Sequence, residues 1–264
     1  MDTIFKLILL ILLIISSYIL SINIGIWSIF PIWILCGLID VSRHKTMNLK
    51  LLKEYFCGKG FLTFILSPLN LFSDLFSLRN LHTFKVEDLP KEHQDEVNDI
   101  ISLFDKNSKE IGKRFEDAVG DNRSMLFYQW YGYKLDKTII DFNKDYKYIK
   151  TIGVSLFREK TSTSRHFGPL RITYRILYNF NKVQNEGSFI EADGRINKWK
   201  FNPLFIFDDT SIHQSFNEED ELIYCAFIDI IRPSYFDNIM KLILSGVGFL
   251  LKNTRSIFYK NWKM

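Results

Sequence analysis

Cysteine and histidine are scarce in this sequence, and their scarcity excludes several classes of protein. The 264 residues contain three cysteines and five histidines. Cys36, Cys57 and Cys225 lie far apart, so the chain has neither a disulfide framework nor a zinc-finger spacing. Unpaired cysteines favour a reducing location, facing the cytosol, for the soluble part. A serine hydrolase of the nucleophile-elbow type is excluded because no GxSxG motif is present.

Charge is nearly absent from the first 42 residues, where only Asp2, Lys6 and Asp40 are charged. Acid is absent from the last stretch, 238–264, which holds five bases. These five bases exceed the net charge of +4, so the remainder of the chain has no positive excess. A broad basic surface is therefore not expected, and we predict no nucleic-acid partner.

An apolar run from Leu7 to Leu38 dominates the N-terminal part. Roughly 20 residues cross the core of a bilayer, so the run predicts one spanning helix with a re-entrant piece, or two helices. A cleavable signal peptide is the alternative, but the run is too long and almost lacks a preceding charge. Bases and a histidine follow between Arg43 and Lys53, and by the positive-inside rule they predict that the rest of the chain faces the cytoplasm.

The remaining chain divides by composition into three parts. Within the connector 46–90, the segment Gly60–Leu81 is apolar but interrupted by charge and proline, which fits either a helix on the membrane surface or a core helix of the domain. The tail 236–264 combines bases with aromatic residues, which favours binding to an anionic membrane over a solvated helix. The predicted organisation is an anchor at 1–45, a connector at 46–90, a domain at 91–235 and a basic amphipathic tail at 236–264.

The domain is predicted to be mainly β. Apolar residues at helical spacing between Val97 and Phe104 indicate one amphipathic helix near its start. Short β-type runs separated by polar turns follow, which is typical of a sandwich, jelly roll or barrel. The runs are Met125–Tyr133, Thr151–Phe157, Arg171–Phe180, Gly187–Glu191, Leu204–Phe207 and Glu221–Ile230.

His166 and His213 are the two histidines in this β region, and each lies in a predicted turn beside a strand. A single histidine in such a place is usually structural. Strand ends of a jelly roll converge on one mouth, so two histidines at such positions form a candidate metal site. Iron(II) oxygenases bind the metal with two imidazoles and often a carboxylate, which usually follows the first histidine by two residues. That place is occupied here by Gly168.

Two arginines are predicted on one face of the run Arg171–Phe180, because Arg171 and Arg175 are separated by an even number of residues. Arginines that face inward need an anion, whereas on an edge strand they would face water.

The ordered motifs around these residues resemble the aspartyl/asparaginyl β-hydroxylase family, over about Met125 to Pro233. The motifs are His166-x-Gly168-Pro169 with Arg175 nine residues after the histidine, Phe207-Asp208-Asp209-Thr210-x-x-His213 with Asn217, and Asp229-x-x-Arg232-Pro233. The resemblance implies a double-stranded β-helix, or jelly roll, with flanking helices, here behind an N-terminal transmembrane segment. It also implies an iron(II)- and 2-oxoglutarate-dependent dioxygenase. The segment Phe127–Gly132 and the anchor are similar to the bacterial lipid A hydroxylase branch of that family.

The resemblance assigns roles to five residues. His166 and His213 match the iron ligands, and no catalytic residue beyond the metal centre is implied. Arg175, Ser155 and Trp130 match groups that bind the cosubstrate 2-oxoglutarate. Gly168 agrees with the family, whose members lack the carboxylate ligand and let water fill its place.

Two positions depart from the family pattern. A histidine expected two residues after Arg175 is Leu177, and a second cosubstrate arginine expected ten residues after His213 is Ile223. A buried carboxylate without a charged partner costs several kcal/mol, so binding of 2-oxoglutarate is expected to be weak. Arg171, predicted on the same face as Arg175, is the candidate replacement.

These observations lead to two functional hypotheses. The first is a membrane-anchored dioxygenase that hydroxylates an unactivated C–H bond of a lipid acyl chain or of a peptidyl aspartate or asparagine, with membrane lipid as a partner. The second is a non-catalytic binding protein on the same fold that has lost 2-oxoglutarate binding.

Overall fold

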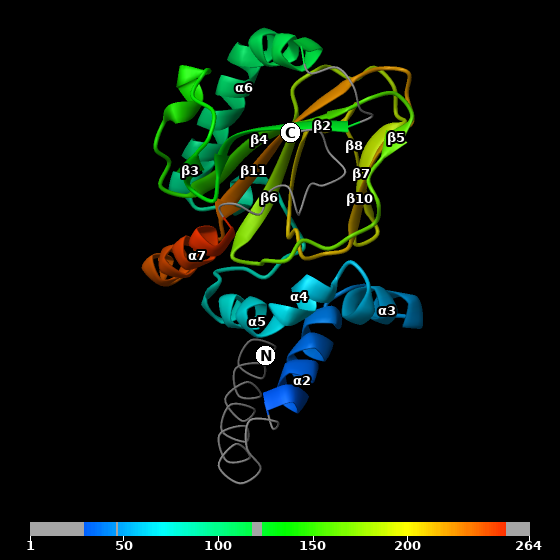
Figure 1. Cartoon of the computed structure of the whole chain (residues 1–264), viewed down its shortest axis with the longest axis vertical. Helices are drawn as coiled ribbons and strands as arrows, with labels where there is room; N and C mark the ends of the chain where they lie inside the picture. Colours follow the sequence, from blue (N-terminus) through cyan, green and yellow to red (C-terminus); the bar gives the residue numbers. More distant parts are fainter. Residues whose placement is uncertain (1–28, 46, 118–122, 252–264) are drawn as a thin grey trace.

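Two antiparallel sheets form the body of the protein (Figure 1). The computed structural model describes residues 29–45, 47–117 and 123–251. The larger sheet has the strand order β1 (Thr83–Phe84), β9 (Leu204–Phe207), β6 (Thr173–Asn179), β11 (Ile223–Ile231), β4 (Ile149–Phe157), β2 (Arg123–Trp130) and β3 (Tyr133–Lys134). The smaller sheet has the order β5 (Thr161–Ser162), β10 (His213–Asn217), β7 (Ser188–Ala192) and β8 (Arg195–Lys198).

This arrangement confirms the predicted mainly-β jelly roll with flanking helices. Each β-type run recognised in the sequence contains or overlaps a strand of the structure, with ends that differ by a few residues. Asp193 and Gly194 form the turn that joins β7 to β8, and both residues have positive φ, of 48° and 75°. Strand β10, which begins at His213, was not predicted.

The larger sheet is covered by a helix on one side and faces the smaller sheet on the other. Helix α6 (Lys91–Asp117) is the predicted amphipathic helix, and its apolar residues Val97, Ile100 and Phe104 are fully buried. They belong to one core cluster with outward-facing residues of the sheet such as Ile152 and Ile228. A second cluster lies on the opposite face, between the two sheets. Because successive side chains of a strand point to opposite faces, one face of the larger sheet packs in the core with α6, and the other face lines the space between the two sheets.

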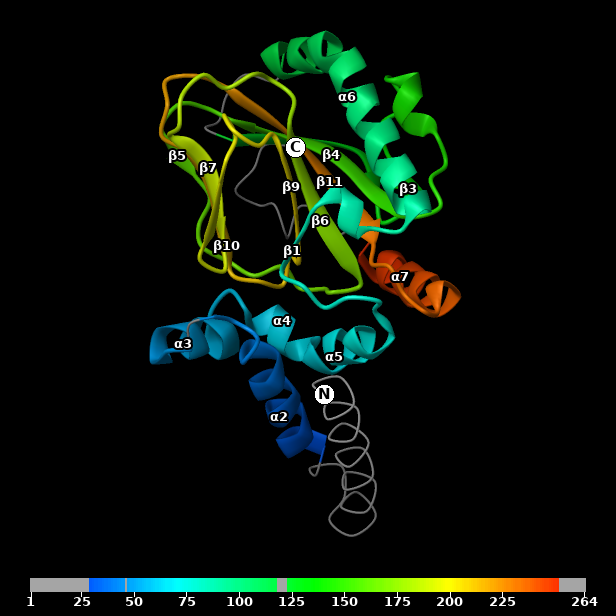
Figure 2. The same cartoon turned by 180° about the vertical axis from the view of Figure 1, so that it is seen from behind.

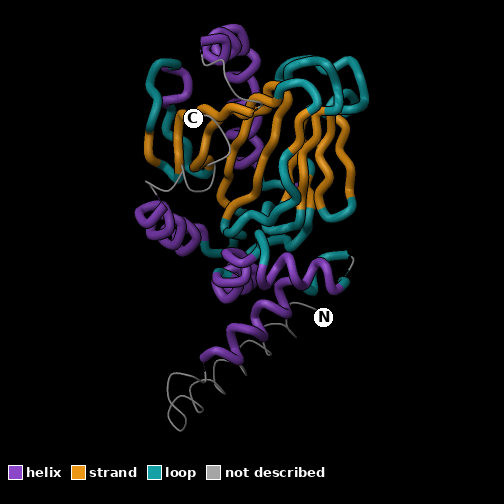
Figure 3. Tube along the Cα trace, turned by 45° about the vertical axis from the view of Figure 1, so that its right-hand side comes forward, coloured by secondary structure: helices purple, strands orange, loops and turns teal. Residues whose placement is uncertain are grey.

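Four helices lie below the two sheets in every view (Figures 1, 2 and 3). They are α2 (Ile29–Val41), α3 (Leu49–Cys57), α4 (Phe61–Ile65) and α5 (Ser67–Phe76). Tyr55 and Phe64 of this group pack with Phe167 and Ile212, which come from loops of the jelly roll. Helix α7 (Asp237–Leu251) lies beside the group, and short 3-10 helices occur at Val86–Asp88 and Ile140–Asn143.

A buried network of ion pairs also joins these helices to the jelly roll. Arg171 is 1 % exposed and bonds to carboxylates from three segments: Asp40 of α2, Asp74 of α5 at 3.0 Å, and Asp208 after β9 at 3.1 Å. Two further arginines bond to carboxylates of this network: Arg43 to Asp208 and Arg232 to Asp74. Burial alone would raise the pKa of Asp208, but Arg171 and Arg43 hold that pKa far below its usual range.

The predicted membrane segment is only partly covered by the structure. Most of the run Leu7–Leu38, like the tail beyond Leu251, lies outside the described residues. Of the helices that the described ranges contain, none combines the length and the apolar character needed to cross a bilayer. Segment Gly60–Leu81 contains α4 and α5, which bury Phe64 and Leu71 yet expose Phe61 by 52 % and Phe72 by 36 %. The segment therefore has the buried apolar residues expected of a core helix and also the exposed ones expected of a helix on the membrane surface.

Candidate metal centre

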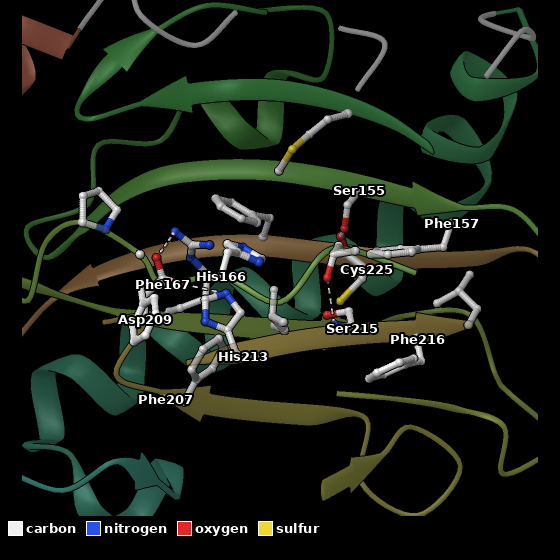
Figure 4. Close-up of a pocket in the computed structure, with 18 of the residues that line it drawn as sticks. Ser155, Phe157, His166, Phe167, Phe207, Asp209, His213, Ser215, Phe216 and Cys225 are labelled. Carbon is white, nitrogen blue, oxygen red and sulfur yellow. Dashed lines mark hydrogen bonds and ion pairs between the residues drawn. The ribbon is translucent and has the colours of Figure 1, made fainter. Parts of the chain in front are cut away.

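His166 and His213 lie side by side at one end of the space between the sheets (Figure 4). Their backbones exchange two hydrogen bonds: the N–H of His166 donates to the carbonyl of His213 at 3.0 Å, and the N–H of His213 donates back at 2.9 Å. The two ring centroids are 4.2 Å apart. The isolated antiparallel bridge brings together two imidazoles that are 47 positions apart in the sequence.

The backbone fixes the tautomer of both rings. Nδ1 of His166 lies 2.6 Å from the carbonyl oxygen of Ser164, and Nδ1 of His213 lies 2.8 Å from that of Ser211. A carbonyl only accepts, so each Nδ1 carries the proton and donates it. Burial lowers the pKa of His166 to about 3 and that of His213 to about 4, which keeps both rings neutral. Each Nε2 therefore keeps a free lone pair, the form in which imidazole binds a metal.

Asp209 completes the polar end of this site. Its Oδ1 is buried without a hydrogen-bond partner and lies 3.5 Å from Nε2 of His213. Two groups that only accept are thus buried next to each other, which is unfavourable unless a cation lies between or beside them. This donor set fits iron(II), held by the two imidazoles with the carboxylate close by. Among the residues that the structure describes, no group of three or more histidine, cysteine, aspartate or glutamate side chains is arranged to hold a metal ion.

Gly168 is required by the position of Asp209. A Cβ at residue 168 would lie 1.9 Å from Oδ2 of Asp209 and 2.8 Å from its carbonyl oxygen. The N–H of Gly168 also donates to that carbonyl at 2.7 Å. The carboxylate of Asp209 thus occupies the space where a side chain two residues after the first histidine would stand.

We expect Gly168→Ala to destabilise the protein by about 1–3 kcal/mol, the usual cost of overpacking a filled site. The added methyl group must push Asp209 away from Arg175, so iron affinity should fall as well. Denaturant unfolding and iron titration measure both effects. Gly112→Ala is the matched control, because a Cβ at Gly112 meets nothing within 4 Å. If Gly168→Ala left both the unfolding midpoint and the iron affinity unchanged, Asp209 would not crowd residue 168.

Arg175 lies in the same cavity and is already paired. Its Nε donates to Asp229 at 2.7 Å, one amino group donates to Asp209 at 3.1 Å, and its guanidinium stacks 3.5 Å above the ring of Phe227. Burial is the main cause that raises the pKa of Asp229. The cavity has a volume of about 150 Å³, and among the lining residues whose side chains the structure describes, Arg175 is the one lysine or arginine. A ligand carboxylate bound at this end would compete with Asp209 and Asp229 for this guanidinium.

Ser155 and Trp130, which the resemblance assigns to cosubstrate binding, also line the cavity. The hydroxyl of Ser155 donates to the backbone carbonyl of Cys225 at 3.1 Å. Ile223 and Leu177, the two departures from the family pattern, line the cavity as well and are 2 % and 8 % exposed. The donor set therefore fits iron(II), while Leu177 and Ile223 stand where the resemblance expects a histidine and a second cosubstrate arginine.

The prediction that Arg171 replaces this cation is wrong. Arg171 precedes β6, which begins at Thr173, and its side chain is bound to Asp40, Asp74 and Asp208. It does not line the cavity. The cause lies in the strand boundary, because alternation of faces applies only within the strand.

The positions of Asp209 and Asp229 in the site are not predictable from the sequence. Both stand in the quoted motifs, but a carboxylate four residues before a histidine gives no local sign that the two side chains meet. Only the loop between β9 and β10 places Asp209 against His213, and only the pairing of β6 with β11 places Asp229 opposite Arg175.

Several solved structures resemble parts of the chain at low identity, and some of them are described as cupin domains. One is a predicted oxalate decarboxylase from Thermotoga maritima, with 14 % identity over 41 % of this chain and 80 % of that chain and a TM-score of 0.29. Another is a mutant of salicylate 1,2-dioxygenase from Pseudoaminobacter salicylatoxidans, with 10 % identity over 49 % of this chain and 34 % of that chain and a TM-score of 0.30. No curated protein sequence matches the chain.

A family model gives a stronger result. The model described as aspartyl/asparaginyl beta-hydroxylase matches residues 95–233, just over half of the chain. The matched range contains the histidine pair, Asp209, Arg175 and every strand of the jelly roll except β1. The chain belongs to the aspartyl/asparaginyl β-hydroxylase family.

Proposed function

We propose that this protein is a membrane-anchored, iron(II)-dependent dioxygenase that couples oxidation of a 2-oxo acid to hydroxylation of an unactivated C–H bond. The observation that carries the proposal is the pair of neutral imidazoles with free Nε2 atoms beside the unpartnered oxygen of Asp209. This arrangement lies in a cavity with one guanidinium, as binding of an acid at the metal requires.

The protein's own groups have distinct tasks in this reaction. His166 and His213 would hold iron(II), and Asp209 would orient a ligand on it or balance its charge. When bound, iron(II) supplies the activation of dioxygen, by which the 2-oxo acid yields carbon dioxide and an acid one carbon shorter while the second oxygen atom enters the C–H bond. Arg175 can bind the carboxylate of the 2-oxo acid, because its guanidinium faces the metal end. Phe167 and Phe207 line this end and exclude water.

The proposed location is the membrane, with the jelly roll facing the cytoplasm. The helices below the sheets and α7 expose large apolar side chains: Phe30 by 63 %, Leu49 by 84 %, Phe61 by 52 %, Leu242 by 74 % and Phe249 by 62 %. Such side chains on a helical surface favour contact with lipid. The proposed substrate is accordingly a lipid acyl chain, as in the lipid A hydroxylase branch, or an aspartyl or asparaginyl side chain of a peptide near the membrane.

The second candidate function is a non-catalytic binding protein on the same fold. Ile223 and Leu177 favour it, because they stand where the resemblance predicts a second cosubstrate arginine and a histidine. This candidate predicts a cavity that binds ligands without turnover.

Release of carbon dioxide from a 2-oxo acid tests the proposal. Purified protein in detergent should release ¹⁴CO₂ from [1-¹⁴C]-2-oxoglutarate only when iron(II) and oxygen are both present, and weakly, because Ile223 stands where the resemblance expects the second cosubstrate arginine. Arg175→Ala should lower this release by about 10- to 150-fold, the equivalent of one charge-assisted contact of about 1.5–3 kcal/mol. Arg79→Ala, in an exposed ion pair far from the cavity, is the control. Iron binding without any release from any 2-oxo acid would favour the non-catalytic protein.

A further inference from the structure

A group of helices that the family model does not cover contacts the metal centre. The match begins at residue 95, whereas α2, α3, α4 and α5 lie between residues 29 and 76, below both sheets (Figure 1). Residues of these helices pack with Phe167, which follows the first candidate iron ligand, and with Ile212, which precedes the second. The helices therefore reach both segments of the chain that carry the ligands.

His44, three residues after the end of α2, contacts the segment of the second ligand. Its imidazole is buried, and its Nδ1 lies 3.0 Å from the carbonyl oxygen of Val41, so Nδ1 carries the proton and donates it. Its Nε2 accepts from the N–H of Ile212 at 3.2 Å. Burial lowers the pKa of His44, which keeps the ring neutral and leaves Nε2 able to accept.

The N–H of Ile212 and the carbonyl of Ser211 belong to the same peptide group. That carbonyl accepts from Nδ1 of His213 at 2.8 Å, the bond that fixes the tautomer of this ring. Because a peptide group is planar and trans, its N–H and its C=O point in opposite directions, and fixing one direction fixes the other. A hydrogen bond at the N–H also polarises the carbonyl and strengthens the bond that it accepts. His44 is thus linked to His213 through one rigid unit.

The segment of the first ligand is fixed by the same part of the chain. The ring of Phe167 has edge contacts with the rings of His44 and Tyr55, with centroids 5.5 Å and 5.6 Å away. Thr63 of α4 is buried and donates from Oγ1 to the carbonyl of Gly168 at 3.0 Å. These contacts act on the two residues that directly follow the first ligand, so they restrict the direction in which its imidazole points.

We propose that His44 is a positioning residue of the metal centre, and that through His44 and Thr63 the helices before the jelly roll set the directions of both iron ligands. The inference rests on the iron site of the proposed function and adds to it groups that lie outside residues 95–233. The jelly roll supplies the ligands, and the helices supply part of their support. A purely structural role for His44 predicts a loss of stability without a change at the metal.

Three replacements of His44 separate these two roles. The side-chain amide of glutamine extends to about the position of Nε2, so its oxygen can accept from Ile212, whereas asparagine is too short and leucine has no acceptor. Anaerobic titration of the full-length protein in detergent should show about a tenfold loss of iron(II) affinity in His44→Leu and His44→Asn. Tenfold is the lower end of the loss that outer-shell partners of metal ligands usually cause. His44→Gln should have nearly the wild-type affinity.

Cobalt(II) provides a readout that a loss of stability alone does not change. The visible absorption spectrum of bound cobalt(II) depends on the geometry of its ligands, so it should differ from wild type in His44→Leu and agree with it in His44→Gln. Thr63→Val removes the hydroxyl that holds Gly168 but keeps the shape of the side chain, so it should change the spectrum, whereas Thr63→Ser should not. Melting temperatures establish that each variant is folded, and if His44→Leu does not fold, His44→Asn and Thr63→Val decide.

Three results would overturn the inference. A wild-type iron(II) affinity and cobalt(II) spectrum in both His44→Asn and Thr63→Val would leave these residues a structural role only, with the proposed function intact. An equal loss of affinity in His44→Gln and His44→Leu would show that the acceptor for Ile212 is not what matters. Wild-type protein that binds neither metal would refute the inference together with the proposed iron site.

Discussion

Replacing His166 or His213 by alanine should reduce iron(II) affinity by more than about 100-fold, because loss of an outer-shell partner of a metal ligand already costs roughly 10- to 100-fold. Each variant removes one of the two free Nε2 atoms at the polar end of the cavity. Anaerobic iron titration followed by metal analysis measures the loss. The fold should survive, because the backbone bonds between residues 166 and 213 do not involve the side chains.

His93→Gln is the matched control for this experiment. His93 is buried to a similar extent as His213, but it stacks on Tyr148, and its Nε2 lies 3.1 Å from the carbonyl oxygen of Ile231. His44 is less suitable, since its Nε2 accepts from the N–H of Ile212, the residue next to His213. If His166→Ala or His213→Ala retained iron while His93→Gln lost it, the metal site would lie elsewhere.

Arg171→Met should destabilise the protein by about 3–5 kcal/mol, the cost of removing one partner from a buried ion-pair network. The substitution leaves Asp40 and Asp208 buried without their main counter-ion. It also removes the largest influence that lowers the pKa of Asp208, so this carboxyl should take up a proton at a higher pH. Denaturant unfolding of the full chain in one detergent gives the free energy of unfolding.

Lys91→Ala provides the comparison for Arg171. Lys91 forms an ion pair with Asp95 at 2.8 Å, but both side chains are more than half exposed. Exposed pairs of this kind contribute about 0–1 kcal/mol, so this variant should unfold almost like wild type. A loss below about 1 kcal/mol in Arg171→Met would mean that the network does not hold the lower helices to the jelly roll.

Local sequence patterns predicted most of the strands that build the cavity. Strand β10 and the positions of Arg171 and Asp209 depend on long-range contacts instead. The alternation in β4, β6 and β11 is visible in the sequence because each strand has one face in a packed core. Strand β10 has the sequence His213-Gln214-Ser215-Phe216-Asn217, whose polar residues hide its strand character. Its pairing with β7 is a tertiary contact that no local pattern reports.

The contacts of the Arg171 side chain could not be predicted from a local pattern either. Its partners Asp208, Asp74 and Asp40 lie 37, 97 and 131 positions away in the sequence. A sequence pattern placed Arg171 on the face of Arg175, whereas these three carboxylates hold it on the outside of the cavity. The histidine pair could be predicted because a family motif marks both residues. Asp209 could not be predicted from local pattern, because its proximity to Gly168 and His213 exists only in the folded chain.

Isotope labelling with ¹⁸O₂ tests most directly that this cavity is the site of an iron-dependent dioxygenase. A dioxygenase that oxidises a 2-oxo acid places one atom of dioxygen in the resulting carboxylic acid. With iron(II) and 2-oxoglutarate, mass spectrometry should find one ¹⁸O in the acid that is one carbon shorter, and none with His213→Ala. A shortened acid without ¹⁸O, or equal labelling with His213→Ala, would contradict the account.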